Sequence, residues 1–228
     1  MIQIPVLFSL FPQTASATLL GTNKLAGIWG TSAAAWNYAR SSYLSMIIAM
    51  PSAIAAFCGS FAGALLVTHV SGDFIRKLLP FILALIVIYT YAKKDLGIEH
   101  RPACSGWRQQ SAAVLAGILI GFYDGFFGPG TGSFLVFAYI KLLGFDFLRA
   151  SAAAKVVNVA CNFAALLWFG SSGHLLWQPG LMMAVFNVAG SLCGARLALR
   201  HGSGLVRKLF LLVTSLLILK TGHDVFFV

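Results

Sequence analysis

Long apolar stretches separated by short polar segments run through the whole chain of 228 residues. In the second half, these stretches cover about residues 111–127, 132–144, 147–169, 179–200 and 205–222. In the first half, they cover about residues 16–38, 48–69 and 74–91, with a shorter stretch at 1–13. As helices, most are long enough to cross the roughly 30 Å hydrocarbon layer of a membrane. Since open strands cannot satisfy their backbone in lipid, the pattern predicts an all-α fold, a polytopic transmembrane helical bundle.

The apolar pattern matches itself at an offset of 131 residues, without a gap, from about residue 20 to residue 91. At this offset Lys24 corresponds to Lys155. The segment Gly59–Ala64 (GSFAGA) corresponds to Gly190–Ala195 (GSLCGA). Duplication of an almost wholly apolar chain is typical of secondary transporters.

The duplication predicts a single transmembrane domain, 1–228, made of two repeats. We expect the first repeat at 1–95 and the second at 110–228. The offset places the partner of segment 111–127 before residue 1, so the first repeat lacks its opening helix. Two explanations fit this pattern: the helix has been lost, or the sequence begins downstream of the true start.

The basic residues predict how the two repeats are oriented. If segments 111–127 and 132–144 form a broken pair whose ends return to one side, ten lysines and arginines collect on that side and two on the other. If the break lay within a single span, the division would be five against seven. Because cytoplasmic loops carry the excess of positive charge, the first arrangement is favoured. Each full repeat then crosses an odd number of times, which predicts inverted repeats with broken or re-entrant helices.

The composition argues against a soluble protein and against several kinds of site. The chain is 59% hydrophobic and 10% charged, whereas soluble domains are about 25% charged. Its net charge of +10 comes from residues at the ends of apolar segments, without a basic run that would predict nucleic-acid binding. The four cysteines have no metal-like spacing. We therefore expect contact with the lipid bilayer, no nucleic-acid partner, no metal and no cofactor, and leave the oligomeric state open.

Two lysines lie deep inside predicted membrane helices. Lys24 and Lys155 each stand about eight residues into a helix, roughly 12 Å from its start. Inserting a lysine at such a depth costs on the order of 2.5–3.5 kcal/mol, so each requires a partner. Asn23 precedes Lys24, and Asn158 follows Lys155 by three residues. A cation surrounded by amide donors suits a small oxyanion; the alternatives are a structural lysine paired with Asp124, or one that extends to the membrane interface.

A glycine-rich segment, Gly121–Ser133 (GFYDGFFGPGTGS), interrupts the second repeat. Its glycines and proline break the helix, and the half-helix that begins near Thr131 directs free N–H groups and a positive dipole end into the break. Transporters with broken helices bind anions at such points. Asp124 is the one acidic residue inside an apolar segment, and it can neutralise a lysine or carry a coupling proton. We predict substrate contacts in this segment at Asp124, Gly128, Gly130, Thr131 and Gly132; a tight helical hairpin is the structural alternative.

Three segments resemble those of the sulfite exporter TauE/SafE family of bacterial membrane permeases. They are Leu20–Leu25 (LGTNKL), Gly121–Gly132 (GFYDGFFGPGTG) and Ala152–Asn158 (AAAKVVN). Together with the duplication, the similarity covers nearly the whole chain. It implies a multi-pass protein of the cell inner membrane, tied to export or uptake of sulfite, sulfonates and related organic anions. The spacing of the residues alone implies only an anion.

These observations predict a secondary membrane transporter, or permease, for small oxyanions, without enzymatic activity. The predicted substrate contacts outside the glycine-rich segment are Lys24, Lys155, Asn23 and Asn158. Two alternatives remain: a truncated or accessory membrane subunit without transport activity, and an intramembrane hydrolase that uses Ser133. A serine nucleophile needs a base at its own depth, whereas all five histidines lie in loops or near segment ends.

Overall fold

The computed structural model describes residues 3–39, 45–92 and 106–201, and their regular structure is entirely helical. The eight helices of these ranges are α1 (Gln3–Leu10), α2 (Ser16–Ala39), α3 (Met46–Thr68), α4 (Gly72–Ala92), α5 (Trp107–Phe126), α6 (Thr131–Leu143), α7 (Phe147–Ser171) and α8 (Trp177–His201). Each one overlaps a predicted apolar segment. The all-α prediction is therefore confirmed for the described residues, while the predicted segment 205–222 lies outside them.

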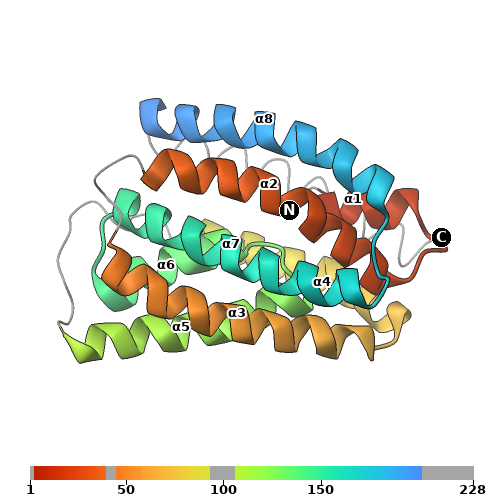
Figure 1. Cartoon of the computed structure of the whole chain (residues 1–228), viewed down its shortest axis with the longest axis horizontal. Coiled ribbons are helices and arrows are strands. Elements are labelled where there is room, and N and C mark those ends of the chain that lie inside the picture. The colour runs from red at the N-terminus through yellow and green to blue at the C-terminus, as the bar shows by residue number, and fades with distance from the viewer. Residues whose placement is uncertain (1–2, 40–44, 93–105, 202–228) are drawn as a thin grey trace.

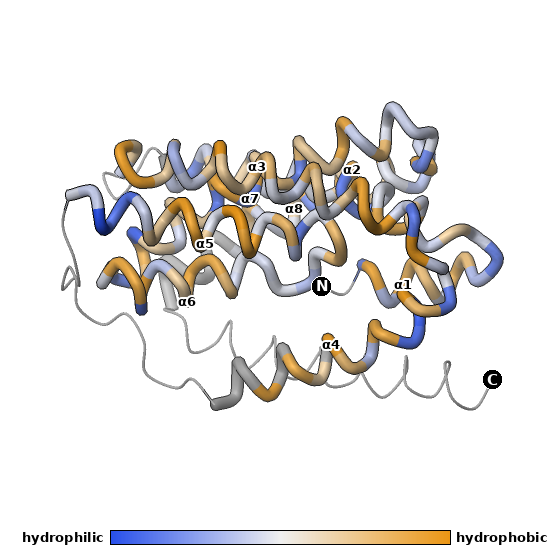
Figure 2. Tube along the Cα trace, turned by 90° about the horizontal axis from the view of Figure 1, so that it is seen from below, coloured by the Kyte–Doolittle hydropathy of each residue, from blue (hydrophilic) through white to orange (hydrophobic). Residues whose placement is uncertain are grey.

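The long helices run side by side along the long axis of the molecule (Figure 1). Helices α2 and α7 pack against each other at the centre, with α8 on the outer side of α2 and α3 against α7. Helix α5 covers α3, and the short helix α6 packs between α5 and α7. Helix α4 contacts α2 and lies at one side of the bundle (Figure 2). The two lysine-bearing helices therefore occupy the centre of the described bundle.

Helices separated by the 131-residue offset begin at matching positions. Helix α2 begins at Ser16 and α7 at Phe147, while α3 begins at Met46 and α8 at Trp177. The contacts match as well, since α2 packs against α8 and α7 packs against α3. Each central helix thus contacts its offset partner and the following helix of the other half. The inverted orientation of the two halves stays a prediction.

Two hydrogen bonds follow the same offset. The Ser60 hydroxyl donates to the Cys161 carbonyl at 2.8 Å, and the Ser191 hydroxyl donates to the Gly30 carbonyl at 2.6 Å. Ser60 and Ser191 are 131 residues apart, as are Gly30 and Cys161. The same kind of hydrogen bond, from a serine hydroxyl to a backbone carbonyl, therefore joins α3 to α7 and α8 to α2.

Helices α3 and α5 approach until their backbones touch. A Cβ atom at Gly59 or Gly63 of α3 would overlap the carbonyl oxygen of Ile118 or Phe122 on α5, and one at Gly121 would overlap Ala56 on α3. Small residues on both helices permit this approach, which is a common way for helices to associate in membranes. The interface fixes the position of α5, and with it the glycine-rich break that follows.

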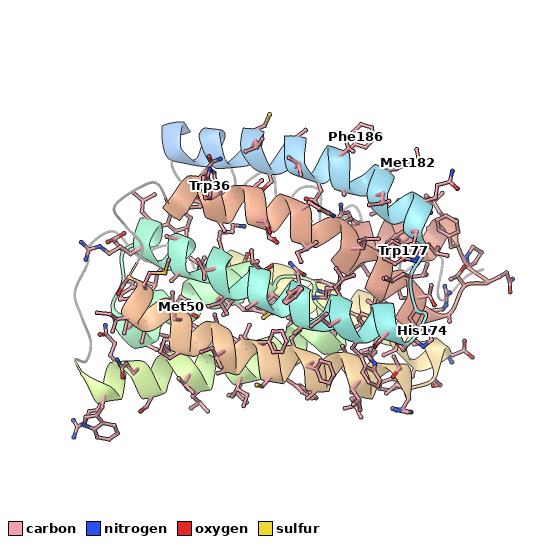
Figure 3. All side chains as sticks on the ribbon, viewed as in Figure 1. Trp36, Met50, His174, Trp177, Met182 and Phe186 are labelled. Atoms are coloured by element: carbon pink, nitrogen blue, oxygen red, sulfur yellow. The ribbon has the colours of Figure 1, made fainter. Side chains whose placement is uncertain are left out.

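Large apolar side chains cover the outside of the described bundle. On α8, Trp177, Met182 and Phe186 are 61%, 61% and 75% exposed, and Met182 and Phe186 project away from the neighbouring helix (Figure 3). Two helices in the described ranges, α3 and α7, are long and apolar enough to cross a membrane, and α6 is a shorter apolar helix. Such a surface is unfavourable in water and suits a hydrocarbon surrounding.

Candidate functional site

Lys24 forms a buried ion pair with the acid of the glycine-rich segment. Its Nζ atom donates to Asp124 Oδ2 at 2.5 Å, and both side chains are about 3% exposed. Lys24 comes from the middle of α2, and Asp124 comes from the last turn of α5. Away from water, each charge compensates the other. Of the alternatives that the sequence leaves open for Lys24, the structure contains the pair with Asp124.

The break between α5 and α6 lies directly on this ion pair. Gly128 and Gly130 have φ values of +92° and +85°, a left-handed conformation that glycine adopts without strain. A Cβ atom at Gly128 would lie 3.1 Å from Lys24 Nζ. The Thr131 hydroxyl donates to the Gly128 carbonyl at 2.8 Å, and the Tyr123 hydroxyl donates to the Pro129 carbonyl at 2.6 Å. These bonds hold the turn against the Lys24 ammonium.

The N-terminus of α6 presents backbone donors at the break. Gly130 occupies the N-cap position and contributes no side-chain cap. The first N–H groups of a helix have no acceptor within the helix, and the helix dipole makes this end positive. A Cβ atom at Gly132 would lie 4.0 Å from Asn158 Nδ2. The amide of Asn158 on α7 therefore lies beside the first turn of α6, where an anion would be stabilised.

A polar cluster joins α2 and α7 next to Asn158. Asn162 Nδ2 donates to Asn158 Oδ1 at 2.9 Å and lies 3.2 Å from Thr31 Oγ1, to which it also donates. The Thr31 hydroxyl in turn donates to the Gly27 carbonyl at 2.9 Å. Thr31 and Asn162 were not among the predicted site residues. The signal that could have found them is the offset itself, because residues 31 and 162 are 131 apart.

Lys155 differs from Lys24 in its surroundings. It is half-buried, and no ion pair or hydrogen bond joins its side chain to another residue in the described ranges. Asn158 follows it by three residues and therefore shares its face of α7. Among the described residues, Asn158 Nδ2 donates no hydrogen bond, so its amide protons can serve a ligand. A cation and an amide donor thus share one face of α7, and the amide lies next to the first turn of α6.

The structure brings most of the predicted site residues into two groups. One contains Lys24, Asp124 and Gly128, and the other contains Asn158 and Gly132, with Lys155 one helical turn away. Asn23 is partly buried and forms no hydrogen bond with either group. Its side chain leaves α2 about 100° around the helix axis from that of Lys24. Gly130 and Thr131 form the turn that lies between the groups along the chain.

Residues 1–221 match the family described as sulfite exporter TauE/SafE. The chain belongs to this family. It is similar to a probable membrane transporter, ORF9, of Sinorhizobium, with 35% identity over 206 residues that cover 90% of this chain and 78% of the relative. It is also similar to the probable membrane transporter YfcA of Escherichia coli K12, with 34% identity over 226 residues that cover 98% and 82%. No solved structure matches the chain.

Membership of the TauE/SafE family confirms the resemblance predicted from the three sequence segments. A further relative, from Haemophilus influenzae, is 33% identical over 228 residues and is likewise described as a probable membrane transporter. The family places this chain among membrane transporters. This finding argues for transport and against the intramembrane hydrolase that the sequence left open.

Proposed function

We propose that this TauE/SafE member is an inner-membrane permease for small oxyanions, with sulfite and sulfonates as the favoured substrates. In this proposal one transmembrane domain, 1–228, contains two inverted repeats, 1–95 and 110–228. The single observation that carries the proposal is the half-buried cation of Lys155, which has no charged partner among the described residues and shares a face of α7 with Asn158, whose amide lies beside the first turn of α6. The description of the family as sulfite exporters supports the sulfur oxyanions.

The chemistry of this group suits an oxyanion rather than a cation or a neutral solute. Lys155 supplies a positive charge, Asn158 supplies amide donors, and the first turn of α6 supplies the backbone N–H of Gly132. Charge-assisted hydrogen bonds of this kind are stronger where water is scarce. An oxyanion has several acceptor oxygens, so it can bind donors from α6 and α7 at the same time.

Lys24 is the second cation that binds the substrate in this proposal, and it differs from Lys155 because it is already paired. Its charge is compensated by Asp124, so an anion can bind there only when that ion pair opens. Asn23, which precedes Lys24, and Thr131, which holds the turn at Gly128, complete the predicted contacts. Among the described residues, the site therefore contains one cation without a charged partner, Lys155, and one compensated cation, Lys24.

Anion flux into proteoliposomes tests the proposal, with sulfite, sulfoacetate, taurine and sulfate offered in turn. Lys155→Met is expected to reduce flux about tenfold or more, because it removes a charged hydrogen bond worth about 1.5–3 kcal/mol. Lys155→Arg retains the charge and is expected to retain part of the flux. Lys141→Met is the matched control, since Lys141 is exposed at the end of α6.

Two results would contradict the proposal. Undiminished flux in the folded Lys155→Met variant would remove Lys155 from the substrate path. Absence of flux for all four anions in the wild-type protein would instead support the accessory, non-transporting subunit that the sequence left open.

A further inference from the structure

We propose that the Lys24–Asp124 pair couples anion transport to proton transport, with Asp124 as the proton carrier. Protonation of Asp124 releases Lys24 to the substrate oxyanion, and the anion and the proton then cross the membrane together. This inference rests on the proposed function, because it assigns the coupling of the same site.

Asp124 is the buried acid of the described part of the chain. The other two acidic residues there are Asp73, which is exposed, and Asp146, which is 22% exposed and caps α7.

The titratable groups that interact with Asp124 within the described ranges are Lys24 on α2, Tyr123 on α5 and Cys161 on α7. Of these three, only Lys24 carries a compensating positive charge.

The charge balance of the pair decides when an anion can bind. With Asp124 ionised, an oxyanion at Lys24 would place at least two negative charges beside one positive charge, away from water. That arrangement is unfavourable, because a buried charge without a partner costs several kcal/mol. With Asp124 protonated, Lys24 keeps one positive charge that attracts the oxyanion without competition from the carboxylate. Occupation of Lys24 by the anion therefore requires that a proton bind first or simultaneously.

Gly128 lets the Lys24 ammonium lie against the turn that leads to the proposed anion site. A Cβ atom there would lie 3.1 Å from Lys24 Nζ and 3.5 Å from Lys24 Cε, so the absence of a side chain lets the cation contact the turn. The same turn leads into the uncapped first turn of α6. The Lys24 ammonium can thus leave the Asp124 carboxylate and bind an oxyanion near the start of α6 without moving across the bundle.

The proton step is balanced without any further reactant. On the side where the anion enters, water gives a proton to one Asp124 oxygen and the O–H bond forms. The ion pair to Lys24 opens, and the oxyanion takes its place. On the opposite side the anion leaves, the O–H bond breaks, the proton returns to water, and the Lys24–Asp124 pair closes again.

The experiment measures sulfoacetate uptake and internal pH in the same proteoliposomes, because the charge of sulfoacetate is constant between about pH 6 and pH 8. For the wild-type protein, an acidic exterior is expected to drive accumulation, accompanied by acidification of the interior. Asp124→Asn mimics the protonated acid. It is expected to retain exchange of sulfoacetate down its own gradient and to lose both the accumulation and the acidification. Asp73→Asn, at an exposed carboxylate, is the matched control.

Several outcomes would overturn the coupling proposal. One is wild-type sulfoacetate flux that ignores the pH gradient, which would leave the permease function intact. Another is acidification that persists in Asp124→Asn. If Asp124→Asn fails to assemble, the double variant Lys24→Met/Asp124→Asn removes both charges, and proton-coupled uptake by that variant would show a purely structural pair. A wild-type protein that carries none of the four anions in the flux assay would instead overturn the proposed function.

Discussion

The two lysines occupy equivalent positions in two offset helices but have different partners. Lys24 is 2% exposed and paired with Asp124, whereas Lys155 is half-buried and has no charged partner among the described residues. Asp124, the acid whose pairing makes the two lysines differ, belongs to α5. A repeated residue therefore does not have a repeated role, because its role depends on which helix packs beside it.

The two offset glycine pairs differ in the same way. Gly59 and Gly63 on α3 are buried against the backbone of α5, whereas Gly190 and Gly194 on α8 are exposed, with no described residue within 4 Å of their Cβ positions. Helix α5 is thus the origin of both differences. It provides the surface that the first glycine pair contacts and the carboxylate that compensates Lys24.

The largest effect is expected from filling the glycine pair that α5 covers. In Gly63→Leu the side chain would overlap the Phe122 carbonyl on α5. Since backbone atoms cannot move aside as side chains can, we expect loss of folded protein, or destabilisation by more than about 3 kcal/mol. The measurement is the yield of monodisperse protein in detergent and its Tm. Gly194→Leu on α8 is the matched control and is expected to leave both nearly unchanged; equal losses would contradict the comparison.

The next effect concerns the stability contribution of the two lysines. Lys24→Met leaves the Asp124 carboxylate buried without a partner, which is expected to cost about 3–5 kcal/mol. Lys155→Met removes a cation that has no charged partner among the described residues, so the protein is expected to keep or slightly increase its stability. Thermal unfolding in detergent measures both. Recovery of the wild-type Tm in Lys24→Met/Asp124→Asn would confirm that the loss comes from the unpaired acid.

The smallest effect tests the helix caps that begin α2 and α7. Asp146 accepts a hydrogen bond from the Arg149 N–H at 2.9 Å and caps α7, whereas the offset position before α2 is the exposed Ala15. Ala15→Asp is expected to supply the missing cap and to stabilise the protein by about 0.5–1 kcal/mol. Asp146→Ala is expected to destabilise it by a similar amount. Thermal unfolding measures the two shifts, and a Tm that falls in Ala15→Asp would show that the two helix starts are not equivalent.

Local patterns in the sequence were sufficient for the helices. Apolar stretches bounded by polar segments predicted where α2, α3, α5, α6 and α7 lie, because hydropathy and turn residues act over a few neighbouring positions. The glycine-rich segment predicted the break after Phe126 for the same reason, since Gly128 and Gly130 are needed for its left-handed backbone. The TauE/SafE family was also recognisable from short segments.

Partners distant in sequence were beyond these local patterns. The sequence contained one acid, Asp124, inside an apolar segment for two lysines inside predicted membrane helices, and it did not show which lysine the acid would pair with. It also did not select Thr31 and Asn162, whose side chains meet where α2 crosses α7.

The sequence by itself determined the all-helical elements, the 131-residue duplication and the family of this protein. Only the tertiary structure decided which lysine is compensated, which glycine pair is covered and which amides surround the break. The physical reason is that an ion pair between residues 100 positions apart depends on how α2 and α5 pack. That packing follows from the fit of whole helix surfaces, which no short segment of the chain contains.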